Sequence, residues 1–173
     1  MSNVTRRDFV KAASAVTAIG ATTLPAWAVQ EKRDPIKVGF IGCGGRGTGA
    51  ANQALTANKD AVIWAMGDAF EDRLSGSKSA LVGEHGTRSE VPKERQFVGF
   101  DAFQKVIDSG VDMVILTTPP HFRPEHIAAA VKAKKHVFCE KPMAVDGTGV
   151  RSVMESAKLA KENDTNLMSG FCW

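Results

Sequence analysis

The sequence predicts an α/β fold in which helices cover both faces of an open, doubly wound parallel sheet. Short apolar runs alternate with segments of helical periodicity along the chain after residue 35. The first apolar run leads directly into a cluster of glycines, and the second ends in an acidic residue, Asp68. The composition, 43% hydrophobic and 24% charged, is that of an ordinary globular protein. These features predict one domain of this class.

The glycine cluster is the most informative of these features. Gly42, Gly44 and Gly47 fit the pattern G-x-G-x-x-G, in which the first glycine makes a tight turn, the second lets the backbone approach a pyrophosphate and the third lets the helix pack on the strand. Asp68 stands 21 residues beyond Gly47, where an acidic side chain holds the ribose hydroxyls of the adenosine half. The glycines alone are also compatible with an ordinary turn, but their context predicts a Rossmann dinucleotide-binding site.

The first half of the domain is predicted to contain three strands and two helices. The strands are the apolar runs at residues 36–41, 61–67 and 96–98. One helix follows the glycines and groups alanines on one face. A second, over residues 71–82, repeats Leu74 and Leu81 at helical spacing. The polar residues 83–95 are predicted to be a loop, and Trp64 a core residue.

The second half continues the alternation with three helices and three strands. The elements, in order, are a helix from Asp101 to the Ser109-Gly110 stop, a strand over 111–117, a helix over 123–134, a strand over 136–139, a helix over 146–163 and a strand over 166–171. Asp101 is a favourable N-cap, and Pro124 suits a first helical turn. Residues 111–117 are apolar at nearly every position, as a parallel strand covered on both faces requires. The last helix takes its apolar positions from Val150, Val153, Met154, Ala157 and Leu159.

The first 28 residues are typical of a twin-arginine export signal. Arg6 and Arg7 precede a mildly apolar run at residues 12–24 and an A-x-A cleavage pattern at residues 26–28. An uncleaved membrane anchor is the alternative, because the uncharged run at residues 12–30 approaches the roughly 20 residues that span a bilayer. The signal predicts that the protein is periplasmic or otherwise exported, with the twin-arginine translocase as a partner. The predicted organisation is a signal peptide over residues 1–28, a linker over 29–35 and a Rossmann domain over 36–173.

Charge and cysteine usage exclude some functions. The net charge is only +3, and much of it lies in the predicted signal, so no nucleic-acid partner is expected. Cys43 and Cys139 would lie two strand spacings apart in a doubly wound sheet, about 10 Å, which is too far for a disulfide. A bridge between Cys139 and Cys172, on neighbouring strands, stays open. No metal site is predicted.

Three stretches of the domain resemble the Gfo/Idh/MocA family of oxidoreductases. They are the glycine loop at residues 39–47, the Thr-Pro-Pro turn at 118–120 and the run at 133–142, which ends in Glu-Lys-Pro. Glu-Lys-Pro after the fifth Rossmann strand is the signature of the family, and the resemblance covers nearly all of the chain after the signal. The leader also resembles the exported glucose-fructose oxidoreductase branch. Lys141 is similar to the family lysine beside the nicotinamide and the reacting hydroxyl.

The motif and the resemblance together imply a set of site residues. The cofactor-binding residues are expected to be Gly42, Gly44, Gly45, Arg46, Gly47, Asp68, Thr118, Pro119, His121, Glu140 and Lys141. Lys141 is the expected catalytic residue. The alternative is that Lys141 is only a surface lysine that pairs with Glu140. His126 is expected to face outward from its helix. The cofactor is expected to be NAD, because Asp68 would repel a 2′-phosphate, with NADP as the alternative if Arg73 accommodates that phosphate.

The implied activity is hydride transfer to or from a sugar or polyol hydroxyl. Two alternatives remain: an NAD-dependent glycoside hydrolase of the same fold, and a nucleotide-binding protein that has lost its chemistry. The family has a second α/β domain that binds the substrate. The chain ends inside the predicted sixth strand, so we expect it to be an N-terminal fragment without this domain. Such a fragment is expected not to turn over substrate. The full-length protein is expected to be a homo-oligomer.

Overall fold

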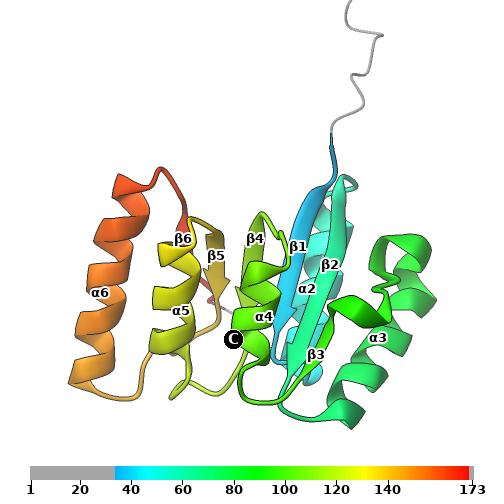
Figure 1. Ribbon diagram of the computed structural model, residues 1–173, viewed down its shortest axis with the longest axis horizontal. Helices are drawn as coiled ribbons and strands as arrows, with labels where there is room; N and C mark the ends of the chain where they lie inside the picture. The colour runs from blue at the N-terminus through cyan, green and yellow to red at the C-terminus, as the bar shows by residue number, and fades with distance from the viewer. Residues whose placement is uncertain (1–33, 172–173) are drawn as a thin grey trace, which may run out of the picture. The chain divides into compact units, whose positions relative to one another are not determined.

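The structure is a computed structural model, and it describes residues 34–171. Its six strands form one parallel sheet in the order β3-β2-β1-β4-β5-β6 (Figure 1). They are β1 (Ile36–Ile41), β2 (Ala61–Asp68), β3 (Gln96–Val98), β4 (Met113–Leu116), β5 (His136–Cys139) and β6 (Leu167–Ser169). The chain order reverses between β1 and β4, and this switch point opens a crevice at the carboxyl ends of the strands. The predicted α/β fold class and Rossmann topology are therefore confirmed.

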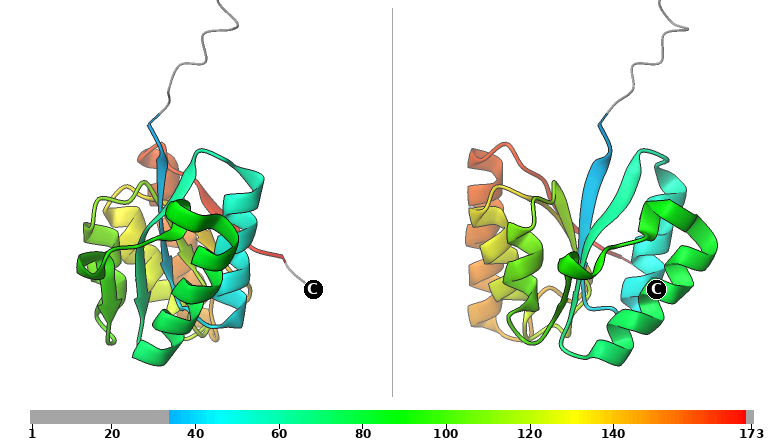
Figure 2. Two further views of the ribbon diagram at one scale, coloured as in Figure 1. Left: turned by 90° about the vertical axis from the view of Figure 1, so that its right-hand side faces the viewer. Right: turned by 45° about the vertical axis from the view of Figure 1, so that its right-hand side comes forward.

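Helices cover both faces of the sheet, as Figures 1 and 2 show. They are α2 (Gly45–Ala57), α3 (Glu71–His85), α4 (Ala102–Asp108), α5 (Arg123–Lys132) and α6 (Gly147–Glu162). Helices α2 and α3 pack on one face, where Val38 and Phe40 of β1 meet Leu55 and Leu74. Helices α4, α5 and α6 pack on the other, around Ile41 and other buried residues. The two cores come from the alternation of side chains along each strand.

Helix α4 lies unusually close to the sheet because two strand positions facing it carry no side chain. A Cβ at Gly39 of β1 would lie 2.6 Å from a methyl group of Val106, and one at Gly67 of β2 would lie 2.9 Å from the other. Both distances are shorter than a carbon–carbon contact allows. The helix therefore packs directly on the backbone of two adjacent strands, β1 and β2, beside the switch point of the sheet.

Some element boundaries differ from those that the sequence predicts. Helix α3 continues to His85, and the predicted loop at 83–95 contains two 3₁₀ turns, η2 (Gly86–Ser89) and η3 (Lys93–Arg95). The strand predicted at 111–117 is shortened to β4. Asp101 stands at the N-cap of α4 but makes no capping hydrogen bond, because its carboxylate pairs with Lys105 at 2.8 Å.

Helix α6 buries a different face from the one that the sequence predicts. Val150 and Met154 are 49% and 59% exposed, whereas Ser156 and Ala160 are buried. Small residues allow α6 to approach α5 closely, so the larger apolar side chains one turn away are left on the surface. The sequence pattern identified the helix correctly and its buried face only in part.

Cys43 and Cys139 are buried free thiols, as their predicted separation requires. Cys172, the predicted signal at 1–28 and most of the linker lie outside the described residues. Within residues 34–171, no helix is long and apolar enough to cross a membrane, and no group of side chains could hold a metal ion.

Candidate functional site

The glycine loop between β1 and α2 has the geometry that its motif predicts. Gly42 has a φ of 95°, and a Cβ there would lie 2.7 Å from the backbone nitrogen of Thr118. A Cβ at Gly47 would lie 1.8 Å from the carbonyl oxygen of Gly42. Gly44 and Gly45, in contrast, have open space where a side chain would be. The first and third glycines are therefore needed by the fold, and the space at the other two admits a ligand at the N-terminus of α2.

Asp68 holds the loop from the neighbouring strand. The backbone N–H of Cys43 donates to its Oδ2 at 2.6 Å, and that of Phe70 donates to its Oδ1 at 2.9 Å. Burial, and then the charge of Asp68, raise the pKa of the Cys43 thiol far above its ordinary value, so the thiol stays protonated. The carboxylate is fixed at the end of β2 by two charge-assisted hydrogen bonds and keeps lone pairs for a ligand.

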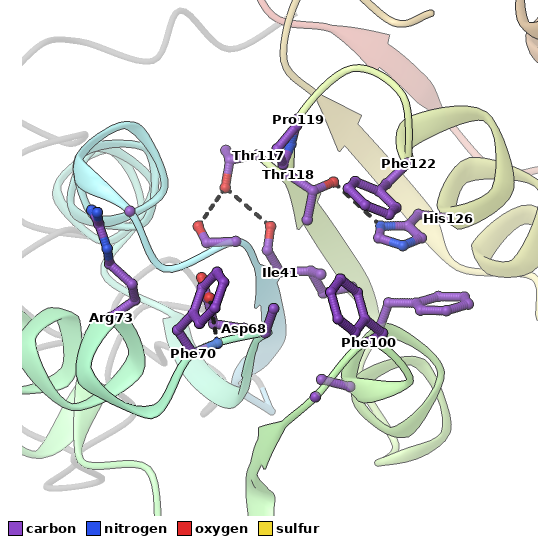
Figure 3. Close-up of a pocket in the computed structure, with 16 residues that line it drawn as sticks. Ile41, Asp68, Phe70, Arg73, Phe100, Thr117, Thr118, Pro119, Phe122 and His126 are labelled. Carbon is purple, nitrogen blue, oxygen red and sulfur yellow. Dashed lines mark hydrogen bonds between the residues drawn. The ribbon is translucent and has the colours of Figure 1, made fainter.

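A cavity of about 310 Å³ opens beside Asp68 at the switch point (Figure 3). It is bounded by the turns that follow β1, β2, β3 and β4, and much of its wall is aromatic. We call it the aromatic pocket; its principal side chains are Asp68, Phe70, Arg73, Phe100, Phe103, Thr117, Thr118, Pro119, Phe122 and His126. An apolar, aromatic pocket next to a carboxylate has the shape and chemistry that suit a flat adenine ring.

His126 lies in the wall of this pocket, so the prediction that it faces outward is wrong. It is 5% exposed, its ring stacks on Phe103 with centroids 4.1 Å apart, and its Nδ1 is hydrogen-bonded to the Thr118 hydroxyl at 3.3 Å. Burial lowers the pKa of His126 to about 4. The imidazole is therefore neutral at physiological pH and acts as a flat, uncharged wall.

Glu140 is buried and faces the glycine loop. Its Oε1 accepts from Nε of Arg46 at 2.9 Å and from Nη2 at 2.5 Å. The alternative in which Glu140 pairs with Lys141 is therefore not found. Lys141 is exposed, and within the described residues it makes no hydrogen bond or ion pair. The ion pair ties the first turn of α2 to the end of β5, and the lysine ammonium remains available.

The sequence-predicted site residues gather at one edge of the sheet, but only some reach the pocket. Those that line it are Gly42, Gly44, Asp68, Thr118 and Pro119. Those outside its lining are Gly45, Arg46, Gly47, His121, Glu140 and Lys141. Gly45 and Gly47 lie in the glycine loop and first turn of α2, whereas Glu140 and Lys141 follow β5, two strands away from β1. This separation suits a ligand as long as a dinucleotide.

Sequence reasoning missed the aromatic wall and one buried arginine. Phe70 and Phe100 follow the ends of β2 and β3, and Phe122 lies in the turn after β4. Aromatic residues just beyond the carboxyl ends of strands were the available signal. Arg123 is 6% exposed and donates three hydrogen bonds to backbone carbonyls of the turns after β4 and β5. No motif marks that role.

Comparisons with known proteins agree with this geometry. The chain is 33% identical over 136 residues to myo-inositol 2-dehydrogenase of Thermotoga maritima, covering 79% of this chain and 36% of that protein. It is 27% identical over 184 aligned positions to a glycosyl hydrolase family 109 protein of Shewanella baltica, covering 94% of this chain and 39% of that protein. The chain thus spans little more than a third of the length of these relatives.

A solved structure and a family model cover the same region. A variant of a 3-ketoreductase from Actinomadura kijaniata, in complex with TDP-benzene and NADP, superposes with a TM-score of 0.58 at 28% identity, over 79% of this chain and 38% of that one. The model of the Gfo/Idh/MocA family, described as an oxidoreductase family with an NAD-binding Rossmann fold, matches residues 36–171. Because this match takes in every strand and helix of the described sheet, the chain belongs to the Gfo/Idh/MocA oxidoreductases and carries their NAD-binding Rossmann domain.

Proposed function

We propose that the whole protein is a nicotinamide-dependent oxidoreductase that transfers hydride to or from a hydroxyl-bearing carbon of a polyol or sugar. The observation that carries the proposal is Lys141, an exposed ammonium without an ion-pair partner in the described residues, at the carboxyl end of β5. It lies on the same edge of the sheet as the glycine loop and Asp68. The resemblance to a myo-inositol 2-dehydrogenase supports a polyol as the substrate class.

The residues of this chain have separable roles in such a reaction. The amides at the start of α2 bind the pyrophosphate, and Asp68 accepts hydrogen bonds from the ribose hydroxyls. The bound nicotinamide supplies or accepts the hydride. Lys141 contacts the reacting oxygen. In alcohol oxidation its side chain acts as the neutral amine, whose lone pair takes the hydroxyl proton as the hydride leaves, and in carbonyl reduction the ammonium donates that proton to the oxygen. Arg46 occupies the Glu140 carboxylate and so leaves Lys141 without a competing partner.

The test is Lys141→Ala in the full-length protein, with Lys132→Ala as a matched exposed-lysine control on the far end of α5. The formation of reduced nicotinamide is followed by its absorbance with myo-inositol as the first substrate probe. General acid–base assistance is worth about 10² to 10⁴ in rate, so the rate should fall by that factor while NAD affinity is nearly unchanged. A variant that turns over normally, or that loses NAD binding instead, would show that the role of Lys141 is wrong.

A glycoside hydrolase that uses bound NAD is the second candidate. It is favoured by the similarity to family 109 proteins, which covers 94% of the chain. Nitrophenyl glycosides distinguish the two candidates, because a hydrolase releases nitrophenol without net reduction of NAD. Absence of both activities with intact NAD binding would favour the third possibility, a nucleotide-binding protein without chemistry.

We further propose that the protein folds around its cofactor in the cytoplasm and is exported with it through the twin-arginine translocase to the periplasm, where it acts as a homo-oligomer. Arg6 and Arg7 carry the export part of the proposal, since this route transports folded proteins. Replacing both by lysine should retain the protein inside the cell. Native exported protein should release dinucleotide into the supernatant when it is denatured, and folded exported protein that is empty would refute the resident cofactor.

A further inference from the structure

The turns after β4 and β5 are joined by a single buried side chain. Nε of Arg123 donates to the carbonyl of Thr118 at 2.7 Å, and its Nη1 donates to the carbonyls of Glu140 at 2.7 Å and Pro142 at 2.6 Å. Arg123 is the first residue of α5 and is 6% exposed. One guanidinium therefore spans two turns that belong to neighbouring strands.

The contacts of Arg123 surround Lys141 along the chain. The carbonyls of Glu140 and Pro142 are those directly before and after Lys141, and both accept from the same nitrogen. The carboxylate of Glu140 is occupied by Arg46, so Arg123 does not form a salt bridge with it. Its buried charge is instead satisfied by three backbone oxygens. The hydrogen bonds of Arg123 therefore fix the position of the backbone, and they do not link it to another charged side chain.

We propose that Arg123 is the positioning residue for Lys141, because it locks the backbone on both sides of the lysine to the Thr118 turn that lines the aromatic pocket. The inference rests on the proposed function for the role of Lys141. Arg123 touches neither substrate nor cofactor in this scheme. It fixes the distance between the lysine and the dinucleotide-binding edge of the sheet.

The planar fork of arginine is what this geometry requires. The N–H groups of the planar guanidinium point in fixed directions, so one side chain can donate to carbonyls of two turns at once. Lysine has the same charge and three donors, but all of them radiate from one atom. Burial lowers the pKa of Arg123, yet an arginine keeps its proton, and the substitution Arg123→Lys therefore changes geometry more than charge.

Arg88 provides a matched control. Its Nη1 also donates to three backbone carbonyls, those of Leu55, Asn58 and Ala61, at 2.9, 3.2 and 3.4 Å. Those carbonyls lie in the last turn of α2, in the turn that follows it and at the start of β2, at the opposite edge of the sheet from Lys141. Arg88→Lys therefore makes the same residue exchange at a second backbone clamp and leaves the turns around Lys141 untouched.

The experiment compares wild type, Arg123→Lys and Arg88→Lys in the full-length protein. A misplacement of about 1 Å costs about 10²-fold in rate, so kcat with NAD and myo-inositol should fall by that factor in Arg123→Lys, with a much smaller change in KM. Hydrogen exchange should accelerate at the amides of Phe122 and Glu140, which bond to Pro119 and Leu116. Arg88→Lys should leave kcat and both amides unchanged.

The outcomes separate this proposal from the proposed function. If wild type oxidises no polyol, the proposed function fails, and the exchange rates alone decide whether Arg123 locks the two turns. Equal kcat and equal exchange in Arg123→Lys and wild type would overturn the positioning role. If Arg123→Lys does not fold, native-state hydrogen exchange on the wild-type protein decides. The amides of Phe122 and Glu140 should then exchange through one opening reaction with the same denaturant dependence. Independent opening of the two amides would contradict the proposal that Arg123 joins the two turns.

Discussion

Arg46 and Glu140 stand 94 positions apart in the chain, and their side chains form a doubly hydrogen-bonded ion pair between the first turn of α2 and the end of β5. The Glu140 side chain is 3% exposed and that of Arg46 is 35% exposed. The pair thus connects the helix that follows the glycine loop with the residue that precedes Lys141. Water cannot replace Arg46 at the buried carboxylate without cost.

Arg46→Ala is expected to lower the free energy of unfolding by about 2 kcal/mol, since it leaves a buried carboxylate without its partner. Adding Glu140→Gln should recover part of the loss, and urea unfolding of the two single variants and the double variant measures it. The exposed Asp101–Lys105 pair is the control, and Lys105→Ala should not change stability measurably. If Arg46→Ala is as stable as wild type, the ion pair has no structural role.

The two glycines at positions 47 and 44 should respond differently to alanine. Gly47→Ala places a carbon on the Gly42 carbonyl, and we expect it to cost about 3 kcal/mol or more of stability before any ligand is added. Gly44→Ala meets nothing within the protein and should leave thermal unfolding unchanged. It should nevertheless weaken NAD binding, measured by calorimetric titration, because the new methyl group occupies the space that the pyrophosphate needs. Equal effects of the two variants on the apo protein would contradict this division.

Asp68→Ser is expected to shift the cofactor preference from NAD toward NADP. Loss of a charged hydrogen-bond acceptor should weaken NAD binding about tenfold or more, and loss of its charge should improve binding of the 2′-phosphate. Glu71 and Asp72 in the first turn of α3 oppose the phosphate further, whereas Arg73 favours it. Titration of both cofactors against wild type, Asp68→Ser and Asp72→Ser checks this. Tighter binding of NADP than of NAD by wild type would refute it.

His126 should make stability depend on pH. Its pKa is lowered by burial from 6.5 to about 4, so between these values the unfolded chain binds a proton that the native state does not. Stability from this group is therefore complete above about pH 6.5 and is lost as the pH falls toward 4. We expect a loss of about 2 kcal/mol between pH 8 and pH 5 from this residue.

Urea unfolding at the two pH values measures this loss in wild type and two variants. His126→Phe should remove it, because no group is left to take up the proton on unfolding. His121→Phe, at an exposed position, should retain it. If His126→Phe has the same pH dependence as wild type, another group is responsible.

Local sequence signals predicted the sheet and the geometry of the glycine loop because they act over short distances. An apolar run followed by Gly42, Gly44 and Gly47 specifies strand, turn and helix within a dozen residues. The orientation of His126 was not predictable in the same way. Its environment comes from Phe103 and Thr118, which precede it by 23 and 8 residues, and a polar side chain on a helix is assigned to solvent unless those neighbours are known.

The role of Arg123 depends on tertiary structure even more strongly. Its three acceptors are carbonyl groups, which every residue carries, so no side-chain pattern in the sequence marks them. The pairing of Arg46 with Glu140 is similar, because two charges so far apart in sequence meet only after β1, β4 and β5 are aligned. The predicted residues were correctly gathered at one edge, but the contacts among them were not predicted.

The close contact of α4 with the sheet has a consequence for how this family member can diversify. Phe100 and Phe103 reach the aromatic pocket from the amino-terminal end of α4, and Gly67 lies beneath that helix. A single methyl group added at Gly67 would lift the helix, and with it one wall of the pocket, although it would never touch a ligand. Gly67 therefore helps to set the position of that wall from beneath the helix, although it does not itself line the pocket.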